Sequence, residues 1–579
     1  MSRRNPLFKP RVACLLFLSL LLGACANLTD VLAEQLFLPK DARPATYDVR
    51  TREAAMQTSD GVTLTADIHA PVGPTSTPTI LVRIPFNDEL WNRLRSDSIG
   101  RYWAKRGYTV VVQGTRGRYR SEGTFYPAVN EERDGRETIE WLKTQPWFDG
   151  RLAMWGGSGF GHTQWAVSDL AEEGPDAFAI QIASTSYYST FYHGGAFALE
   201  SALYWGLVSP PERDRPTSGA EIQKGADGWP VIEADDRALK DVTFFNDWAT
   251  HRTNDAYWRS IDGTDRAMKV SAPVLMLGGW YDPFLPSMLE DFTRLTTENP
   301  HPLARQSRII IGPYIHAGEI EWPGAKLDAP YRTASIQPVL NWFDHWLGTA
   351  QASLRGAPVR IFVLGDNVWR DENEWPLART QYTPFYFHSN GALDPKVPSP
   401  GERPIDWVYD PQNPVPTRGG AMLGPRSGIF EQDAALTRSD VITFETQPLE
   451  MPLEVTGPIS ALLYVSTDAP STDFTVKLLD VHPNGEAYNI ADGIVRKNFS
   501  PDVAQEIEVL LNPTSVVFPA GHRIRIDVSS SNFPRFDRNP NTGEDPATAV
   551  IHRPARQTLH LERQPHSQIV LPVIPRDLP

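Results

Sequence analysis

One serine of this 579-residue chain lies in a setting that is typical of a catalytic nucleophile. Ser158 ends the apolar run RLAMWGGS and is surrounded by glycines in the sequence WGGSGFG. A tight turn from a buried strand into a helix requires small neighbours, and it lifts the serine hydroxyl above the sheet. The same turn directs the following backbone N–H at a substrate oxygen. The pattern therefore predicts a nucleophile at Ser158, with the N–H of Gly159 as an oxyanion donor.

The same glycines also fit a second interpretation, the glycine-rich turn that binds a dinucleotide. Gly157, Gly159 and Gly161 have a suitable spacing. Such a turn usually opens the first βαβ unit, however, and needs an acidic residue about 20 residues further on. Here earlier apolar runs precede the turn, and the next run ends in Ala183-Ser184. We therefore favour the nucleophile and expect no cofactor.

A serine hydroxyl is a poor nucleophile near neutral pH unless a histidine takes its proton and an acid orients that histidine. Two later apolar runs lead into suitable residues, PVLMLGGW into Asp282 and SRIIIGPY into His316. The order serine, acid, histidine is typical of enzymes with such a turn. The interval between the acid and the histidine holds one helix and two loops, which predicts neighbouring strands. His162, beside the turn, is expected to pack on the start of the helix.

Other kinds of chemistry have less support. Both cysteines, Cys14 and Cys25, lie in the first 25 residues, which excludes zinc–thiolate sites and a cysteine nucleophile from the main body. No HExxH motif or carboxylate cluster with metal spacing occurs, and the acidic segment 537–545 is interpreted as a turn because its glycine is misplaced for a calcium loop. We expect no metal. The net charge of −15 argues against nucleic acid, whose phosphates require a basic surface.

The elements that must position these residues follow from the pattern of apolar runs. Continuous apolar runs predict strands that are covered on both faces, as in a parallel sheet, at residues 79–86, 108–115, 151–158, 177–184, 273–280 and 307–314. Amphipathic segments at residues 131–145 and 286–298 predict helices between them. This alternation predicts a doubly wound α/β domain.

Changes of composition divide the chain into parts. Residues 185–272 hold no comparable run and are rich in aromatic residues, which predicts a mostly helical insertion. Short alternating segments with turn signals predict a β-sandwich or jelly roll from residue 356 onwards. The expected parts are a signal peptide (1–24), a tether (25–45), an α/β core in two pieces (46–184 and 273–355), a helical cap (185–272) and a C-terminal β domain (356–579).

The N-terminal sequence predicts export. Basic residues precede the apolar stretch Val12–Leu22, which is shorter than the roughly 20 residues that span a bilayer. The stretch ends in LGAC, which resembles a bacterial lipobox, in which cleavage precedes a cysteine that becomes lipidated. We expect a lipid anchor on Cys25 and a place in the bacterial cell envelope, with the outer membrane or periplasmic side favoured by Ala26. An ordinary signal peptide with a chance cysteine is the alternative.

Nearly the whole mature chain resembles the cocaine-esterase-like and X-prolyl dipeptidyl-peptidase serine hydrolases, often named CocE/NonD. The matching segments lie in family order and include SDGVTLTADIHAP, VQGTRGRYRSEGTF, TIEWLKTQPWFDGRLAMWGGSGFGHTQW, GGWYDPF, IIGPYIHAG, FDHWLG, IFVLGDNVWRDENEWPLA and SSSNFPRFDRNPNTG. The resemblance implies an α/β-hydrolase core with a helical cap and a C-terminal jelly roll. It also implies small-molecule ester or amide substrates, with Ser158 as nucleophile, Asp282 as acid and His316 as base.

Among the positions that depart from the family pattern, two lie close to the nucleophile or the oxyanion hole. The family usually has a tyrosine after Arg-x-Pro, and its hydroxyl is half of the oxyanion hole. Here the sequence RIPF places Phe86 at that position, and the loss of one oxyanion donor costs roughly 10²–10³ in rate. Asn87, another donor or a water is expected to replace the hydroxyl, or else the enzyme is slow. Gly159 stands where the family has a larger residue, which is expected to widen the site.

The substrate is the least determined part. Trp205 in the cap and Phe284 after the acid are expected, with Phe86, to line an apolar acyl pocket, although simple packing explains them too. Asp88 is a candidate anchor for an α-ammonium group, and a solvated loop explains it equally well. We favour an ester hydrolase. An X-Pro dipeptidyl-peptidase or amino-acid ester hydrolase is one alternative, and a non-catalytic surface-binding lipoprotein with a degraded hydrolase core is another.

Overall fold

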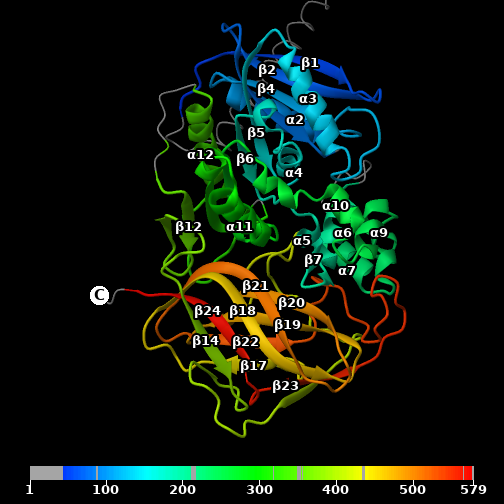
Figure 1. Cartoon of the computed structure of the whole chain (residues 1–579), viewed down its shortest axis with the longest axis vertical. Coiled ribbons are helices and arrows are strands. Elements are labelled where there is room, and N and C mark those ends of the chain that lie inside the picture. The colour runs from blue at the N-terminus through cyan, green and yellow to red at the C-terminus, as the bar shows by residue number, and fades with distance from the viewer. Residues whose placement is uncertain are drawn as a thin grey trace, which may run out of the picture.

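The structure is a computed structural model that describes residues 43–86, 89–209, 217–316, 318–348, 354, 356–432, 437–564 and 566–576. Figure 1 shows an α/β part at one end, a β domain at the other, and a group of helices beside their junction. Cys25 and the lipobox lie outside the described residues. In the described part of the chain, no helix is long and apolar enough to cross a membrane.

The α/β part is built on one mixed sheet with the strand order β1-β2-β4-β3-β5-β6-β9-β10-β12-β13, and β11 pairs with β10. The strands are β1 Val49–Gln57, β2 Thr63–Pro71, β3 Thr77–Ile84, β4 Thr109–Gly114, β5 Phe148–Gly157, β6 Ala177–Gln181, β9 Val274–Tyr281, β10 Arg308–Ile315, β11 Gly318–Glu319, β12 Val359–Val363 and β13 Val368–Glu372. From β4 to β12 all neighbours are parallel. The predicted α/β core is confirmed.

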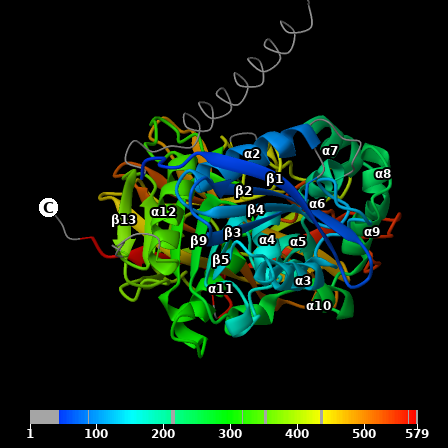
Figure 2. The ribbon, with the colours of Figure 1, turned by 90° about the horizontal axis from the view of Figure 1, so that it is seen from above.

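Helices cover both faces of this sheet, as Figure 2 shows from above. Helices α2 (Glu89–Ala104) and α12 (Tyr331–Trp346) pack on one face through buried side chains such as Trp103 and Val339. Helices α3 (Glu131–Lys143) and α11 (Leu285–Thr293) pack on the other face, where Ile139 is buried. A sheet with two covered faces needs apolar residues at every position, which explains the continuous apolar runs of its strands.

The core sheet continues beyond the boundary that we expected at residue 356. Strand β12 pairs in parallel with β10, with Val359 opposite Ile309, and β13 then pairs antiparallel with β12. Strand β12 therefore extends the core sheet, although it lies beyond residue 356, where the C-terminal part is expected to begin. A short alternating strand has the same local pattern in either sheet, because its pairing partner is set by contacts that are distant in sequence.

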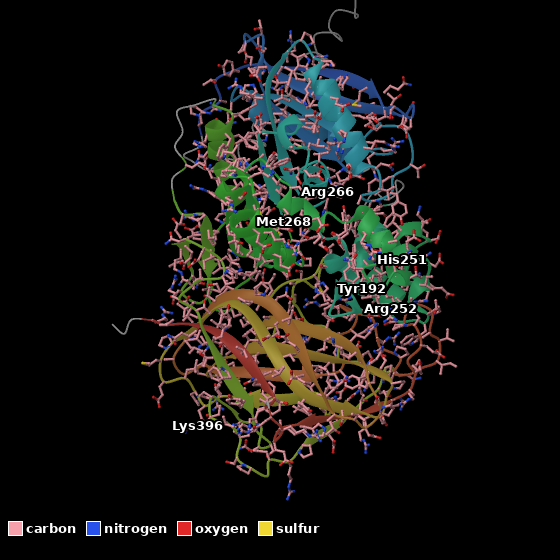
Figure 3. The ribbon with its side chains drawn as sticks, in the orientation of Figure 1. Tyr192, His251, Arg252, Arg266, Met268 and Lys396 are labelled. Atoms are coloured by element: carbon pink, nitrogen blue, oxygen red, sulfur yellow. The ribbon has the colours of Figure 1, made fainter. Side chains whose placement is uncertain are left out.

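The segment between β6 and β9 forms the helical cap. It consists of α5 Tyr188–Phe191, α6 Leu199–Val208, α7 Gly219–Ala226, α8 Ala234–Ala238, α9 Thr243–Thr250 and α10 Ala256–Ile261, with a short hairpin of β7 Tyr192–His193 and β8 Ala196–Phe197. Aromatic rings form its core, for example Phe191 stacked on Trp248 at 4.2 Å. Figure 3 marks Tyr192, His251 and Arg252 in this cap.

The C-terminal domain is a sandwich of two antiparallel sheets, as predicted. One sheet contains β14 Gln381–Phe387, β15 Leu393–Asp394, β16 Ile405–Tyr409, β18 Leu453–Thr467, β21 Gln505–Phe518, β23 Ala555–His560 and β24 Gln568–Ile574; the other contains β17 Ile442–Glu445, β19 Ser471–Val481, β20 Ala487–Asn498 and β22 Arg523–Ser529. The acidic segment 537–545 begins with Asp537, which pairs with Arg496 of β20 at 2.8 Å and accepts a bond from Phe197 of the cap.

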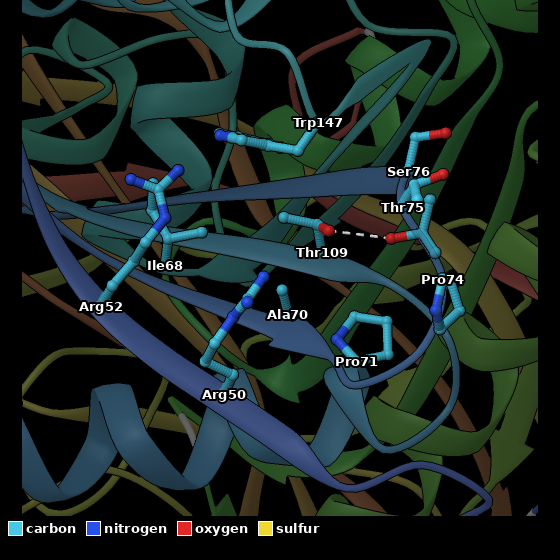
Figure 4. A pocket seen from close by; sticks show the side chains of 11 residues that line it. Arg50, Arg52, Ile68, Ala70, Pro71, Pro74, Thr75, Ser76, Thr109 and Trp147 are labelled. Atoms are coloured by element: carbon cyan, nitrogen blue, oxygen red, sulfur yellow. Dashed lines mark hydrogen bonds between the residues drawn. The ribbon is translucent and has the colours of Figure 1, made fainter.

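A small cavity of about 40 Å³ lies at the amino ends of the parallel strands. Figure 4 shows its lining by Arg50, Arg52 and Trp147, and a dashed line marks a hydrogen bond of Thr109. The hydroxyls of Thr109 and Thr77 lie 2.8 Å apart. Ligands of α/β sheets bind at the carboxyl ends of the strands, which is the opposite edge. A functional site is therefore expected at the carboxyl ends of β5, β9 and β10.

One buried carboxyl group in the cap gives a pH-dependent prediction. Burial raises the pKa of Asp235 to about 6 from its ordinary 3.8, while its Oδ2 accepts a bond from the N–H of Val242 at 2.6 Å. The unfolded chain releases this proton near pH 4 but the folded chain keeps it to about pH 6, so folding stability falls across that interval. The free energy of unfolding of Asp235→Asn is expected to exceed that of the wild type by up to about 3 kcal/mol at pH 8. Below pH 4 the two free energies are expected to be equal.

Thermal unfolding of both proteins at pH 4 and pH 8 measures this difference. Asp236→Asn is the matched control, because Asp236 is the next residue of the same helix and is exposed. An equal pH response of the wild type and Asp235→Asn would contradict the prediction.

Candidate active site

Ser158 occupies a strained turn between strand β5 and helix α4 (Gly159–Trp165). Its backbone has φ 55° and ψ −127°, a conformation that non-glycine residues rarely adopt and that is common at functional sites. The turn is held by a bond from the N–H of Ser158 to the carbonyl of Gln181 at 2.9 Å. A Cβ atom at Gly161 would lie 2.6 Å from Cβ of Ala183, so a glycine is required there for the turn to approach β6.

The structure brings Ser158, His316 and Asp282 together in one hydrogen-bonded series. Nε2 of His316 lies 2.9 Å from Oγ of Ser158, and Nδ1 lies 2.8 Å from Oδ2 of Asp282. Because a carboxylate only accepts, Nδ1 carries the proton and Nε2 accepts from the serine hydroxyl. Asp282 and His316 follow β9 and β10, which are parallel neighbours, as the sequence predicted.

Burial differs along this series. The side chain of Asp282 has no exposed surface, and its Oδ1 accepts a bond from the N–H of Phe284 at 2.8 Å. The side chain of His316 is 17% exposed. The carboxylate is therefore fixed and shielded from water, whereas the imidazole reaches the surface at which a substrate binds.

His162 packs in the protein interior beside the turn, as expected. Its ring stacks on Tyr187 at 4.4 Å and meets the edge of Phe284 at 5.3 Å. Burial, followed by the proximity of His316, lowers the pKa of His162 to about 3. His162 is therefore neutral at any working pH and adds no charge beside His316.

Aromatic side chains border the site. The ring of Phe284 lies 5.4 Å from that of His316, so it adjoins the reacting groups. Trp205 lies further from His316 than Phe284 does. Its ring stacks on His162 at 6.0 Å and on Tyr187 at 5.9 Å, and His162 in turn contacts Phe284. Of these two expected pocket residues, Phe284 contacts the Ser–His–Asp series directly, through the ring of His316.

Phe86 fills the space that the small Gly159 leaves. A Cβ atom at Gly159 would lie 2.6 Å from Cγ of Pro85 and 3.3 Å from Cζ of Phe86. The expectation that Gly159 widens the site is therefore wrong, since the loop that carries Phe86 packs against the glycine. The ring of Phe86 also lies 5.4 Å from Phe160. Asn87 and Asp88, the other residues expected from this loop, lie outside the described residues.

Sequence reasoning missed two features near the site. The hydroxyl of Tyr281, directly before Asp282, donates to the carbonyl of Asn489 at 2.9 Å, so the C-terminal domain braces the end of β9. A cavity of about 50 Å³ behind His162 is lined also by Glu131 and by Arg266, which Figure 3 marks. It has room for a few waters and not for an acyl group. Neither feature leaves a local sequence pattern, because the residues that form it are far apart in the chain.

Comparison with known proteins supports the same assignment. Residues 60–318 match the model of the X-Pro dipeptidyl-peptidase (S15 family), and residues 354–570 match that of the X-Pro dipeptidyl-peptidase C-terminal non-catalytic domain. The chain is 34% identical to cocaine esterase of Rhodococcus sp. (strain MB1 Bresler) over 568 residues, which cover 89% of this chain and 97% of that protein.

Solved structures show the shared fold. An aminopeptidase from the marine sediment archaeon Thaumarchaeota archaeon has a TM-score of 0.78 at 24% identity, covering 93% of this chain and 99% of the other. An α-amino acid ester hydrolase has a TM-score of 0.77 at 22% identity, covering 93% and 98%. The fold, the hydrogen-bonded series and the similarity to cocaine esterase lead to one conclusion: the chain belongs to the CocE/NonD-type serine hydrolases and is a carboxylic ester hydrolase.

Proposed function

We propose that this hydrolase cleaves esters of apolar acyl groups through an acyl-enzyme on Ser158, with His316 as general base and Asp282 as the acid that orients it. The observation that carries the proposal is the bonded series of these three side chains beside the ring of Phe284. The complete series also speaks against a degraded, non-catalytic core.

Acylation follows from the two hydrogen bonds of His316. Oγ of Ser158 attacks the carbonyl carbon of the ester while its proton passes to Nε2 of His316. The tetrahedral intermediate then loses the alcohol, whose oxygen takes the proton from Nε2 as the C–O bond breaks. Asp282 stabilises the transient imidazolium through Nδ1–H and does not itself take the proton.

Deacylation repeats the same steps with water. His316 takes a proton from a water that attacks the acyl carbon, and then returns that proton to Oγ of Ser158 as the carboxylic acid leaves. In both steps the negative charge on the carbonyl oxygen needs hydrogen-bond donors. The N–H of Gly159, the first residue of α4, is the proposed donor on the helix side.

Two features favour esters over peptides. An X-Pro dipeptide or an amino-acid ester carries an α-ammonium group, which calls for a carboxylate near the nucleophile. The residues directly after Asp282, Pro283 and Phe284, offer none, and the candidate anchor Asp88 lies outside the described residues. The phenyl ring at Phe86 also lacks an oxyanion donor, and a poorer oxyanion hole penalises the harder amide reaction more heavily.

Substrate preference tests the proposal. We expect kcat/KM for p-nitrophenyl butyrate or benzoate to exceed that for Gly-Pro-p-nitroanilide by at least about 100-fold, since the site favours apolar acyl groups without an ammonium group. Phe284→Ala is expected to reduce the preference for benzoate over acetate, whereas Tyr382→Ala, an exposed ring of the C-terminal domain, leaves it unchanged. An equal or faster rate on the dipeptide substrate would favour the peptidase.

We also propose that the chain is exported and anchored in the bacterial cell envelope through a lipid on Cys25. The LGAC sequence after a short apolar stretch supports this proposal. Metabolic labelling with palmitate is the test: the wild type should incorporate the label and sediment with membranes, and Cys25→Ser should do neither. Unlabelled wild-type protein would instead support an ordinary signal peptide.

A further inference from the structure

A group of metal-ligating side chains lies at one edge of the four-stranded sheet of the C-terminal domain. Asp480 is near the end of β19, His482 begins the turn into β20, and His522 directly precedes β22. Strand β19 pairs with both β20 and β22, so Asp480 lies opposite Tyr488 on one side and Ile524 on the other. The sheet therefore brings together residues that are 40 positions apart in the sequence.

The three side chains have the geometry of a ligand set. One donor atom from each lies within 4.8 Å of the other two. Nδ1 of His522 is 2.8 Å from Oδ1 of Asp480, and Nε2 of His482 is 3.5 Å from Oδ2. Bond lengths of roughly 2.0–2.2 Å in a tetrahedral zinc site place ligand atoms about 3.4 Å apart. Small rotations of these side chains are enough to reach that arrangement.

The charges around Asp480 call for a cation. Its side chain is only 4% exposed, and among the described residues its ion-pair partners are the two imidazoles, with no lysine or arginine. A buried carboxylate is costly unless a positive charge compensates it. The two imidazole rings lie 4.6 Å apart, so a proton on each would produce repulsion. One divalent cation removes both problems.

We propose that Asp480, His482 and His522 bind a divalent transition-metal ion. Two imidazole nitrogens and one carboxylate oxygen form a ligand set that suits Zn²⁺. The imidazoles are 22% and 15% exposed, which leaves the ion a path from solvent and a position for water. The ring of Tyr488 packs on His482 at 5.0 Å and restricts its orientation, as groups around metal ligands commonly do.

The site is structural in character. Its link to the catalytic residues runs through Asn489, the residue after Tyr488. The carbonyl of Asn489 accepts a hydrogen bond from the hydroxyl of Tyr281, which directly precedes Asp282. The ion is therefore expected to brace the β19–β20 turn against β22 and to take no part in ester hydrolysis. The inference does not depend on the proposed function, because its readout is metal binding.

Calorimetric titration of the full-length chain with Zn²⁺ tests the proposal, after treatment with a chelator and purification without a polyhistidine tag. We expect one equivalent to bind, and His482→Ala and His522→Ala each to weaken binding at least tenfold. Co²⁺ in place of Zn²⁺ should give visible absorption bands in the wild type that both variants lose. Ester hydrolysis by the chelated variants should stay within twofold of the wild type, which also shows that they fold.

His251 supplies the matched control. Its Nδ1 lies 2.7 Å from Asp255 and its ring stacks on Tyr257 at 4.3 Å, so it has the same carboxylate and aromatic partners without a second imidazole. His251→Ala should bind Zn²⁺ as the wild type does. A wild type without a Zn²⁺ site, or His482 and His522 variants that bind as tightly as the wild type, would overturn the proposal.

Discussion

Ser158→Ala is expected to lower kcat for p-nitrophenyl butyrate by about 10⁶-fold, the scale of the loss when a serine hydrolase loses its nucleophile. The reason is geometric: Nε2 of His316 lies 2.9 Å from Oγ of Ser158, and the structure shows the base bonded to this hydroxyl. Alanine removes the attacking atom and keeps the compact turn, so the fold should persist. Steady-state hydrolysis and circular dichroism measure the two effects.

A fluorophosphonate probe makes the same test independent of turnover. Mass spectrometry should locate the adduct on Ser158 in the wild type and find none in Ser158→Ala. Ser168→Ala is the matched control, because Ser168 lies just beyond α4 and is buried, with its hydroxyl bonded to Trp165. It should label and turn over normally. Labelling of another residue, or more than about 1% residual activity, would remove Ser158 from the mechanism.

The base and the nucleophile act as one unit, which gives a further expectation within the same experiment. His316→Ala should lose about as much activity as Ser158→Ala, and the double variant should lose no more than either. Additive losses would show that His316 acts elsewhere than on Ser158.

The sequence was informative wherever a function depends on local pattern. Strands β9 and β10 and the second half of β5 are buried at nearly every position, because both faces of the sheet are covered. A polar residue directly after such a run must lie at the sheet edge, so the pattern alone predicts Ser158, Asp282 and His316, and the structure brings these three side chains into hydrogen-bond contact. Parallel pairing of β9 and β10 then brings the last two together.

Prediction failed where a property depends on packing between distant segments. Strand β12 has the alternating pattern of the C-terminal strands, yet it pairs in parallel with β10 of the core sheet. Gly159 was expected to open space, but the Pro85–Phe86 loop occupies that space. The cluster of Asp480, His482 and His522 has no metal-like spacing, since a turn and two strands separate its members.

The departure at Phe86 also offers the most direct way to increase activity. Its para carbon is the ring atom nearest to Gly159, at 3.3 Å from the position of a Cβ there. A hydroxyl on that carbon would be carried by the ring atom that lies nearest to Gly159, whose N–H is the proposed oxyanion donor. Phe86→Tyr is therefore expected to raise kcat for p-nitrophenyl esters by roughly 10²-fold, the value of one oxyanion donor.

The pattern of rate constants distinguishes this cause from a change in binding. An interaction made only in the transition state raises kcat and kcat/KM by the same factor and leaves KM unchanged. Phe160→Tyr is the matched control, because it adds a hydroxyl to the ring that packs on Phe86 at 5.4 Å, and it should not accelerate the reaction. If Phe86→Tyr leaves kcat unchanged, another donor already serves the oxyanion. Asn87→Ala then identifies it, since it should lower kcat by about 10²-fold if Asn87 is that donor.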